Sequence, residues 1–208
     1  MLYKYSEKFV GFKGKVGNFF GKLPLNPNAW TLLSLVAAFA SFYFILQEEF
    51  IPAALLFGIA AFLDVIDGSV ARVKNKVSVL GAYLDTITDR YVEFIIIFGL
   101  FFAAYPHFDL MGISLFSSKT MLLILLFGSL MTSYSISAAH EEGIEERRLR
   151  GGILERGERM MLLFLIILLS EFSRVYAIYL IAIMAVLANI TALQRIKIAV
   201  DILVKERR

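Results

Sequence analysis

Cysteine is absent from the 208 residues, which excludes disulfides, thiolate metal sites and cysteine nucleophiles. Four prolines and 14 glycines are too few for a fibrous or low-complexity protein. Charged residues make up only 19% of the chain, and the net charge of +3 does not indicate a nucleic-acid partner. The remainder is strongly apolar, with 59% hydrophobic residues, 19 phenylalanines and a mean hydropathy of +0.73. This composition excludes a disordered chain and predicts an integral membrane protein.

Six apolar stretches are long enough to cross a bilayer as helices, which takes about 20 mostly apolar residues. They cover residues 30–46, 51–73, 77–105, 119–139, 154–170 and 175–196. Their apolar runs are continuous rather than alternating, so a β-barrel is not expected. The expected fold class is therefore all-α, with residues 24–208 forming one domain of six transmembrane helices.

Residues 1–23 differ from the rest, because lysines alternate there with aromatic and aliphatic residues. This pattern is typical of an amphipathic helix that lies on an anionic membrane surface, although glycines in the segment weaken a helix. With six spans, eighteen of the 21 Lys and Arg residues fall on one side of the membrane. The positive-inside rule then places both chain termini on the cytoplasmic side of the cell membrane.

Four aspartates are concentrated where the second and third predicted spans approach the cytoplasm. Asp64 and Asp67 are three residues apart, and Asp85 and Asp89 are four apart, so each pair lies on one helix face. The turn between the two spans is short, so the helices are expected to be antiparallel neighbours with all four carboxylates facing each other. Such a cluster needs protons or cations, and oxygen ligands suit Mg²⁺ or Mn²⁺. Two such ions form the usual clamp for a phosphoryl-type displacement.

Small residues accompany these acids. Gly68 and Ala71 share a helix face with Asp64, and Gly81 occupies the facing helix, so a backbone or a substrate can approach closely. Arg72 is placed to contact a phosphate through two hydrogen bonds. Structural packing and an ion-coupled transporter are the alternatives, because acids within a membrane also mark ion paths. A transporter would carry acids along several spans, whereas the first, fourth, fifth and sixth have almost none in mid-membrane.

The spacing Asp-x-x-Asp-Gly-x-x-Ala-Arg, eight residues, then Gly-x-x-x-Asp-x-x-x-Asp resembles the signature of the CDP-alcohol phosphotransferase family. The chain resembles it at every fixed position: Asp64, Asp67, Gly68, Ala71, Arg72, Gly81, Asp85 and Asp89. Residues 27–31, Pro-Asn-Ala-Trp-Thr, are similar to a Pro-Asn-x-x-Thr motif often found at the first span of that family. Six spans after an interfacial helix are also similar to the family layout.

The resemblance implies an enzyme that transfers a phosphatidyl- or archaetidyl-type group from a CDP-activated lipid to a polar alcohol and releases CMP. It implies that Asp64, Asp67 and Asp85 bind two divalent metal ions, Mg²⁺ or Mn²⁺, and that Asp89 both binds metal and serves as the catalytic base. The residues implied to form the CDP site are Asn28, Thr31, Asp64, Asp67, Gly68, Ala71, Arg72 and Gly81. The family likeness also implies a homodimer with its active site on the cytoplasmic side.

A run of charged residues before the fifth span bears on the acceptor alcohol. Arginines there are typical of a solvated cytoplasmic loop, and equally of a site for a phosphorylated acceptor. Residues 151–159 resemble the Gly-x-x-x-Glu-Arg-x-Glu-Arg stretch of the inositol-phosphate branch. That branch includes archaetidylinositol phosphate synthase, phosphatidylinositol phosphate synthase and enzymes that join CDP-inositol to inositol phosphate. Residues 134–141 depart from this branch, because they lack its arginines.

We therefore expect inositol 1-phosphate as the acceptor. The arginines expected to bind its phosphate are Arg148, Arg150, Arg156 and Arg159. Glycerol 3-phosphate is the second choice, since it also brings a phosphate to an arginine cluster, and serine ranks below both. The residues leave the roles of Glu93 and His140 open.

Overall fold

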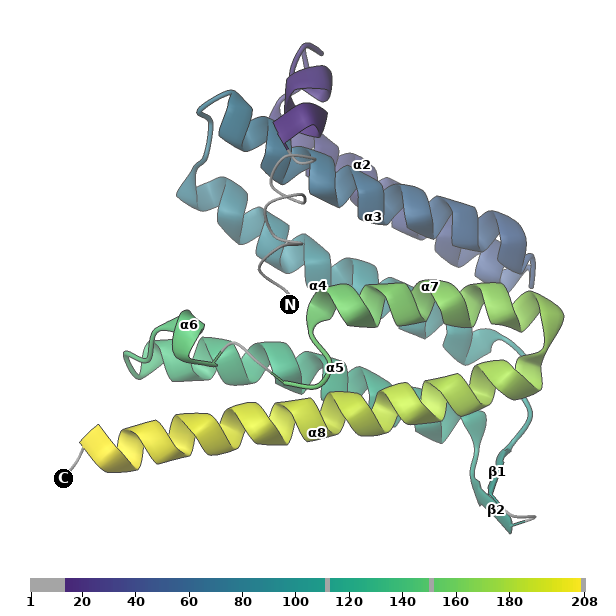
Figure 1. Ribbon diagram of the computed structural model, residues 1–208. Helices are drawn as coiled ribbons and strands as arrows, with labels where there is room; N and C mark the ends of the chain where they lie inside the picture. Colours follow the sequence, from purple (N-terminus) through teal and green to yellow (C-terminus); the bar gives the residue numbers. More distant parts are fainter. Residues whose placement is uncertain (1–13, 111–112, 150–151, 207–208) are drawn as a thin grey trace. The chain divides into compact units, whose positions relative to one another are not determined.

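The computed structural model describes residues 14–110, 113–149 and 152–206, most of which are helical (Figure 1). The chain divides into two compact units, Met1–Ile96 and Ile97–Arg208. The first contains a helical segment over residues 14–20, α2 (Pro27–Leu46), α3 (Phe50–Val73) and most of α4 (Val79–Phe102). The second contains the end of α4 and every later element.

In the first unit, α2 and α3 form an antiparallel hairpin. Its turn includes Glu48, whose φ of 59° lets the chain reverse within three residues. Close to this turn, the Ser41 hydroxyl donates a hydrogen bond of 2.8 Å to the carbonyl of Ala53. The hydroxyl of Thr31 donates to α3 near the opposite end of the hairpin. Polar side chains therefore join the two helices at both ends of their contact.

The helical segment over residues 14–20 packs against the end of this hairpin. Val16 joins Trp30, Ile66 and Val70 in a buried apolar cluster. A Cβ on Gly17 would lie 2.6 Å from the carbonyl oxygen of Ser69, closer than real Cβ atoms come to any atom. The glycine at this position therefore permits the close approach to α3. The first 13 residues of the predicted amphipathic segment lie outside the described residues.

The turn from α3 to α4 has the geometry of a Schellman motif. Asn75 has a φ of 51°, its N–H donates to Arg72, and the N–H of Lys76 donates to the carbonyl of Ala71 at 2.9 Å. Ser78 follows and accepts a hydrogen bond of 3.0 Å from the N–H of Gly81 in the first turn of α4. This sharp turn brings the first turn of α4 to the end of α3 that carries Arg72.

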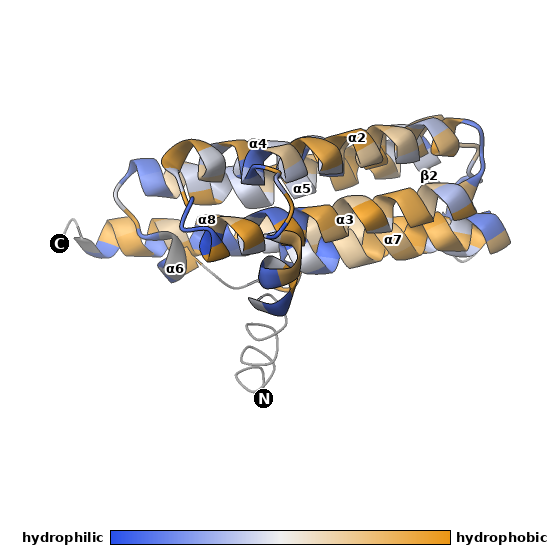
Figure 2. Cartoon of the chain, turned by 90° about the horizontal axis from the view of Figure 1, so that it is seen from above, coloured by the Kyte–Doolittle hydropathy of each residue, from blue (hydrophilic) through white to orange (hydrophobic). Residues whose placement is uncertain are grey.

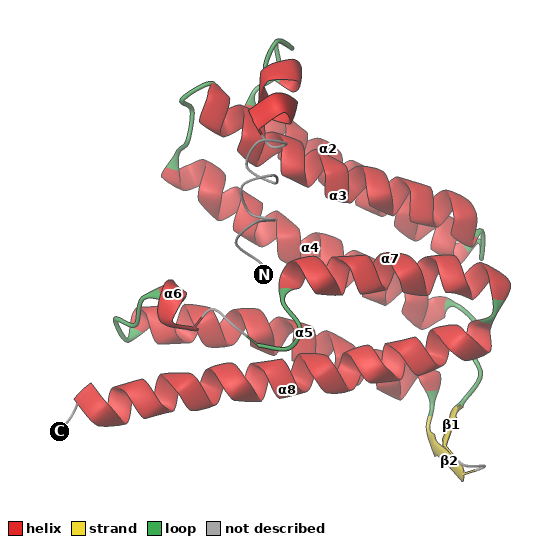
Figure 3. Ribbon diagram, in the orientation of Figure 1, coloured by secondary structure: helices red, strands yellow, loops and turns green. Residues whose placement is uncertain are grey.

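The second unit contains α5 (Ser118–Glu141), α6 (Glu146–Leu149), α7 (Arg156–Phe172) and α8 (Arg174–Glu206). α5 and α8 are in close contact, because Asn189 donates to the carbonyl of Ile124 at 3.0 Å and a Cβ on Gly128 would lie 2.5 Å from Asn189. A hairpin of β1 (Phe108–Leu110) and β2 (Ile113–Phe116) precedes α5 (Figure 3). The apolar runs did not predict this hairpin. Tyr179 of α8 holds it by donating to the carbonyl of Asp109 at 2.7 Å.

Four of the described helices are long and apolar enough to cross a membrane: Pro27–Leu46, Phe50–Val73, Ser118–Glu141 and Arg174–Lys205. Figure 2 colours α2, α3 and α7 as hydrophobic over most of their length. α4 contains four charged residues, and α7 has only 17 residues, so six crossings stay a prediction. The structure is that of an all-helical, multi-pass membrane protein with one small hairpin.

The sixth predicted span is longer than expected, because α8 continues from residue 196 to Glu206. Ala199, Ile202 and Leu203 of this extension pack on a cluster formed by Ala139, Ile144 and Leu149. The sixth apolar stretch predicted only the part of the helix that is long enough to cross a bilayer. Packing against α5 and α6 accounts for the rest.

Candidate active site

A pocket of about 320 Å³ opens in the first unit, where the start of α2, the end of α3 and the start of α4 meet. Seven of the eight residues predicted to form the CDP site line it: Asn28, Thr31, Asp67, Gly68, Ala71, Arg72 and Gly81. The eighth, Asp64, belongs to the acidic group beside it. Besides Pro27 and Asp85, the pocket is lined by four residues that sequence reasoning missed, namely Lys76, Val77, Ser78 and Ala82. Three of these four residues fall in the eight-residue interval between Arg72 and Gly81, and Ala82 directly follows Gly81.

Three of the four aspartates lie together at this pocket. One carboxylate oxygen from each of Asp64, Asp67 and Asp85 lies within 4.8 Å of the others. Asp67 is only 4% exposed, whereas the other two are half-buried. Three anionic oxygens this close repel one another unless a cation lies between them, and hard oxygen ligands suit a divalent ion of the Mg²⁺ or Mn²⁺ type. The donor set therefore fits a divalent metal.

The buried Asp67 carboxylate has a partner on the neighbouring helix. The Thr31 hydroxyl donates to its Oδ2 at 2.6 Å, a short hydrogen bond of the charge-assisted kind. Thr31 lies in the second turn of α2, which begins at Pro27. The bond restricts the rotation of the carboxylate. Thr31 was predicted as a nucleotide contact, and in this structure its hydroxyl contacts a predicted metal ligand.

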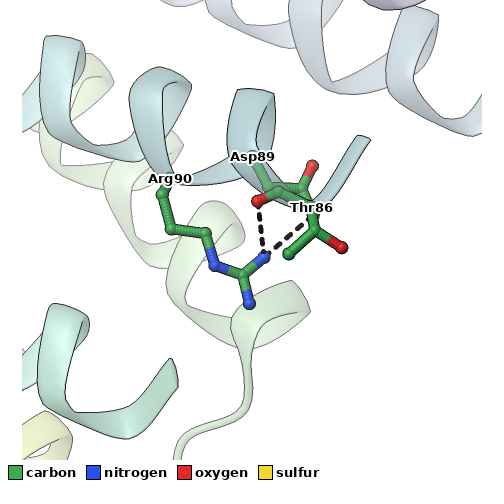
Figure 4. Close-up of polar contacts among 3 residues, drawn as sticks. All are labelled: Thr86, Asp89 and Arg90. Atoms are coloured by element: carbon green, nitrogen blue, oxygen red, sulfur yellow. Dashed lines mark hydrogen bonds and ion pairs between the residues drawn. The ribbon is translucent and has the colours of Figure 1, made fainter. Parts of the chain in front are cut away.

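Asp89 is not part of the group of three acids. It is 6% exposed on α4, and its Oδ2 accepts from the Arg90 guanidinium at 3.3 Å. The same nitrogen of Arg90 donates to the carbonyl of Thr86 at 3.1 Å, as Figure 4 shows. The positive charge of Arg90 therefore lies next to the carboxylate that was predicted to be the catalytic base. Glu93, one turn further along α4, is 4% exposed.

Arg72 lies over the glycine of the motif. A Cβ on Gly68 would be 3.7 Å from one guanidinium nitrogen of Arg72 and 3.8 Å from another. The side chain of Arg72 thus folds back along α3 and borders the pocket, and the residue is exposed. Its five N–H donors match two oxygens of a phosphate.

The arginines predicted to bind the acceptor phosphate all belong to the second unit. Arg156 and Arg159 lie three residues apart in the first turn of α7, where Glu155 and Glu158 form a capping box. Arg159 is 1% exposed and Arg156 is half-buried. Arg148 lies exposed in the short helix α6, and Arg150 lies outside the described residues.

Sequence reasoning missed a buried arginine in α8. Arg195, at the end of the sixth apolar stretch, lies buried within α8 and donates to the carbonyl of Thr132 on α5 at 2.7 Å. The position of an arginine at the end of an apolar run is the only sequence signal for it. His140 lies exposed in the last turn of α5.

Residues 25–192 match the family model of CDP-alcohol phosphatidyltransferases. The chain is 33% identical over 171 residues to the archaetidylinositol phosphate synthase of Pyrococcus horikoshii, covering 82% of this chain and 84% of the relative. It is 30% identical over 181 residues to the archaetidylinositol phosphate synthase of Aeropyrum pernix, covering 87% and 86% respectively.

Solved structures of the Mycobacterium tuberculosis phosphatidylinositol phosphate synthase have the same fold. The form with CDP-DAG bound matches with a TM-score of 0.75 at 22% identity, over 90% of this chain and 92% of that one. The form in complex with manganese and citrate has the same TM-score over 90% and 88%. The match in fold, together with the family model and the curated relatives, shows that the chain belongs to the CDP-alcohol phosphatidyltransferase family and that it is a transferase of phospholipid biosynthesis.

Proposed function

We propose that this protein transfers a phosphatidyl- or archaetidyl-type group from a CDP-linked lipid to inositol 1-phosphate and releases CMP. The observation that carries the proposal is the pocket in which three carboxylates adjoin a small-residue surface and an exposed arginine. That combination suits a diphosphate, whose negative charge must be neutralised before an oxygen can attack it.

In the proposed reaction, the acceptor hydroxyl oxygen attacks the phosphorus that bears the lipid. The bond from this phosphorus to the oxygen of CMP breaks, and CMP leaves with the electron pair. Asp89 takes the proton of the hydroxyl, so atoms and charge balance. Arg90, which holds Oδ2 of Asp89, orients the carboxylate for this step.

Asp64, Asp67 and Asp85 are proposed to hold two divalent ions, Mg²⁺ or Mn²⁺, with Asp89 contributing to the same set. When bound, the ions would neutralise the diphosphate and stabilise the leaving CMP. The structure of a relative in complex with manganese supports this proposal. Gly68, Ala71 and Gly81 are proposed to leave space for the nucleotide, with Asn28 and Arg72 as its polar contacts.

Inositol 1-phosphate as acceptor is supported by two relatives named archaetidylinositol phosphate synthase. It is also supported by the first turn of α7, where Arg156 and Arg159 bring two guanidinium groups that can pair with a phosphate. We propose that Arg148, Arg150, Arg156 and Arg159 contribute to this phosphate site.

The test is CMP release by the purified protein in lipid nanodiscs, with a CDP-linked lipid and Mg²⁺. Inositol 1-phosphate, glycerol 3-phosphate and serine are supplied in parallel, and the lipid product is identified by mass spectrometry. We expect the highest kcat/KM with inositol 1-phosphate. A higher value with glycerol 3-phosphate or serine would overturn the acceptor assignment. CDP-inositol as the donor would test the remaining chemistry of the branch.

We also propose that the active site and both termini face the cytoplasm and that the protein is a homodimer. The first statement rests on the excess of Lys and Arg on one side of the six-span topology. Labelling of single introduced cysteines in intact cells tests the orientation, because the natural chain has none that would react.

A further inference from the structure

Lys74, the residue that caps α3, makes contacts that its position alone does not explain. A lysine at a cytoplasmic helix end satisfies the positive-inside rule and the helix dipole while its side chain remains in water. Here the side chain is half-buried, and its Nζ donates to the carbonyl of Leu23 at 2.9 Å and to that of Leu25 at 3.0 Å. One ammonium therefore binds two main-chain oxygens of a segment about 50 residues earlier in the chain.

That segment also has an apolar attachment, because the side chain of Leu25 packs against the buried cluster that includes Ile66 and Val70 of α3. The segment joins the helical segment that ends at residue 20 to α2, which begins at Pro27. Pro24 and Pro27 have no N–H to donate, and the N–H of Leu23 donates to the nearby carbonyl of Phe20 at 3.1 Å. The Lys74 ammonium supplies charged donors to two carbonyls of this segment, and hydrogen bonds to a charged group are among the stronger ones.

Lys74 joins the start of α2 to the end of α3, and both helix ends line the pocket of the candidate active site, here called the nucleotide pocket. α2 begins two residues after Leu25 and presents Asn28 and Thr31 to the pocket. Lys74 lies two residues after Arg72, which borders the pocket from α3. The main chain of Lys74 is itself held, because its N–H donates to the carbonyl of Val70 at 2.9 Å, just before the turn at Asn75.

We infer that Lys74 is a positioning residue for the nucleotide pocket. It holds the start of α2 against the end of α3, so that Asn28 and Arg72 keep their separation when a nucleotide enters. Lys74 itself does not line the pocket, so its effect passes through these two helix ends. The inference rests on the proposed function, in which this pocket binds the CDP part of the donor.

A purely structural lysine would lower thermal stability and leave the affinity for nucleotide unchanged. A positioning lysine changes the affinity for nucleotide and the KM for the donor. Both constants are independent of the fraction of protein that is folded, so they separate the two roles. The KM for the acceptor serves as an internal reference.

The experiment compares Lys74→Met, Lys74→Gln and Lys74→Arg in the full-length protein in nanodiscs. Binding of CDP in the presence of Mn²⁺ is measured by calorimetry, and KM is measured for the donor and for the acceptor. We expect Lys74→Met to raise the Kd for CDP and the KM for the donor about tenfold, since it removes two charge-assisted hydrogen bonds. Lys74→Arg keeps two donors and should stay near the unaltered protein, with Lys74→Gln between them.

The matched control is Lys22→Met, which removes the same charge from an exposed position close in sequence to Leu23. An equal loss in this control would assign the effect to surface charge and overturn the inference. A Lys74→Met protein with unchanged Kd and donor KM would overturn it as well, whatever its thermal stability. Absence of CDP binding in the unaltered protein would overturn the proposed function, and with it this inference.

Discussion

Replacement of Thr31 by valine removes one hydroxyl from the predicted metal site and changes little else. The two side chains have nearly the same shape, so the buried position can accept valine without a cavity. What disappears is the hydrogen bond of 2.6 Å from the Thr31 hydroxyl to Oδ2 of Asp67. The carboxylate, 4% exposed, then loses the partner that orients it.

The expected result is weaker metal binding. Loss of a partner that orients a metal ligand commonly costs about 10- to 100-fold in metal affinity. We therefore expect Thr31→Val to raise the Kd for Mn²⁺ by about 10- to 100-fold, a loss of about 1.4 to 2.7 kcal/mol. A buried carboxylate that loses this donor also lowers the free energy of unfolding, by about 1–3 kcal/mol.

The assay is titration of the purified protein with Mn²⁺, in which the free ion is followed by electron paramagnetic resonance. Thr31→Ser keeps the hydroxyl and is the matched control, with an expected Kd close to that of the unaltered protein. Thr31→Val with equal or tighter Mn²⁺ binding would refute the reasoning, because Asp67 would then need no partner to serve as a ligand.

Four further outcomes are expected. Asp89→Asn should retain CDP binding, and Mn²⁺ binding through Asp64, Asp67 and Asp85, but abolish CMP release; near-full release in the presence of acceptor would disprove its role as the base. Removal of divalent ions with EDTA should stop transfer, and Mg²⁺ or Mn²⁺ should restore it; activity that survives EDTA would contradict a metal centre. Arg156→Ala should raise the KM for inositol 1-phosphate far more than that for the donor, whereas equal changes would argue against an acceptor-phosphate site. Gly17→Ala should lower the thermal unfolding temperature, because its Cβ meets the Ser69 carbonyl, while Gly14→Ala has open space and should not; equal melting of the two variants would contradict this packing.

The acidic group illustrates what the sequence could predict. Intervals of three and four residues place each pair of aspartates on one helix face, and a short turn brings the two helices together. Asp64, Asp67 and Asp85 accordingly lie within reach of one ion. These are local regularities of helix geometry, so spacing alone is sufficient to predict them.

Contacts that depend on side-chain rotamers, or on packing between residues far apart in the chain, could not be predicted from the sequence. The contact of Asp89 with its neighbour Arg90 depends on rotamers that spacing does not determine. Lys74 binds carbonyls far earlier in the chain, and carbonyls have no residue-specific signature in a sequence. Gly17 counted against a helix by propensity, although its missing side chain is what lets the segment contact α3.

The length of α8 has a consequence for how the protein adapts to its membrane. Its 33 residues span about 50 Å at 1.5 Å per residue, well beyond a hydrocarbon layer of about 30 Å. The α2–α3 hairpin, which is closed by a tight turn, accommodates a change in lipid thickness by tilting or by deforming the bilayer. The last third of α8 instead extends beyond that layer and is held by its packing on Ala139, Ile144 and Leu149. A change in lipid thickness therefore alters how much of this extension is covered by lipid, while its contacts with α5 and α6 persist.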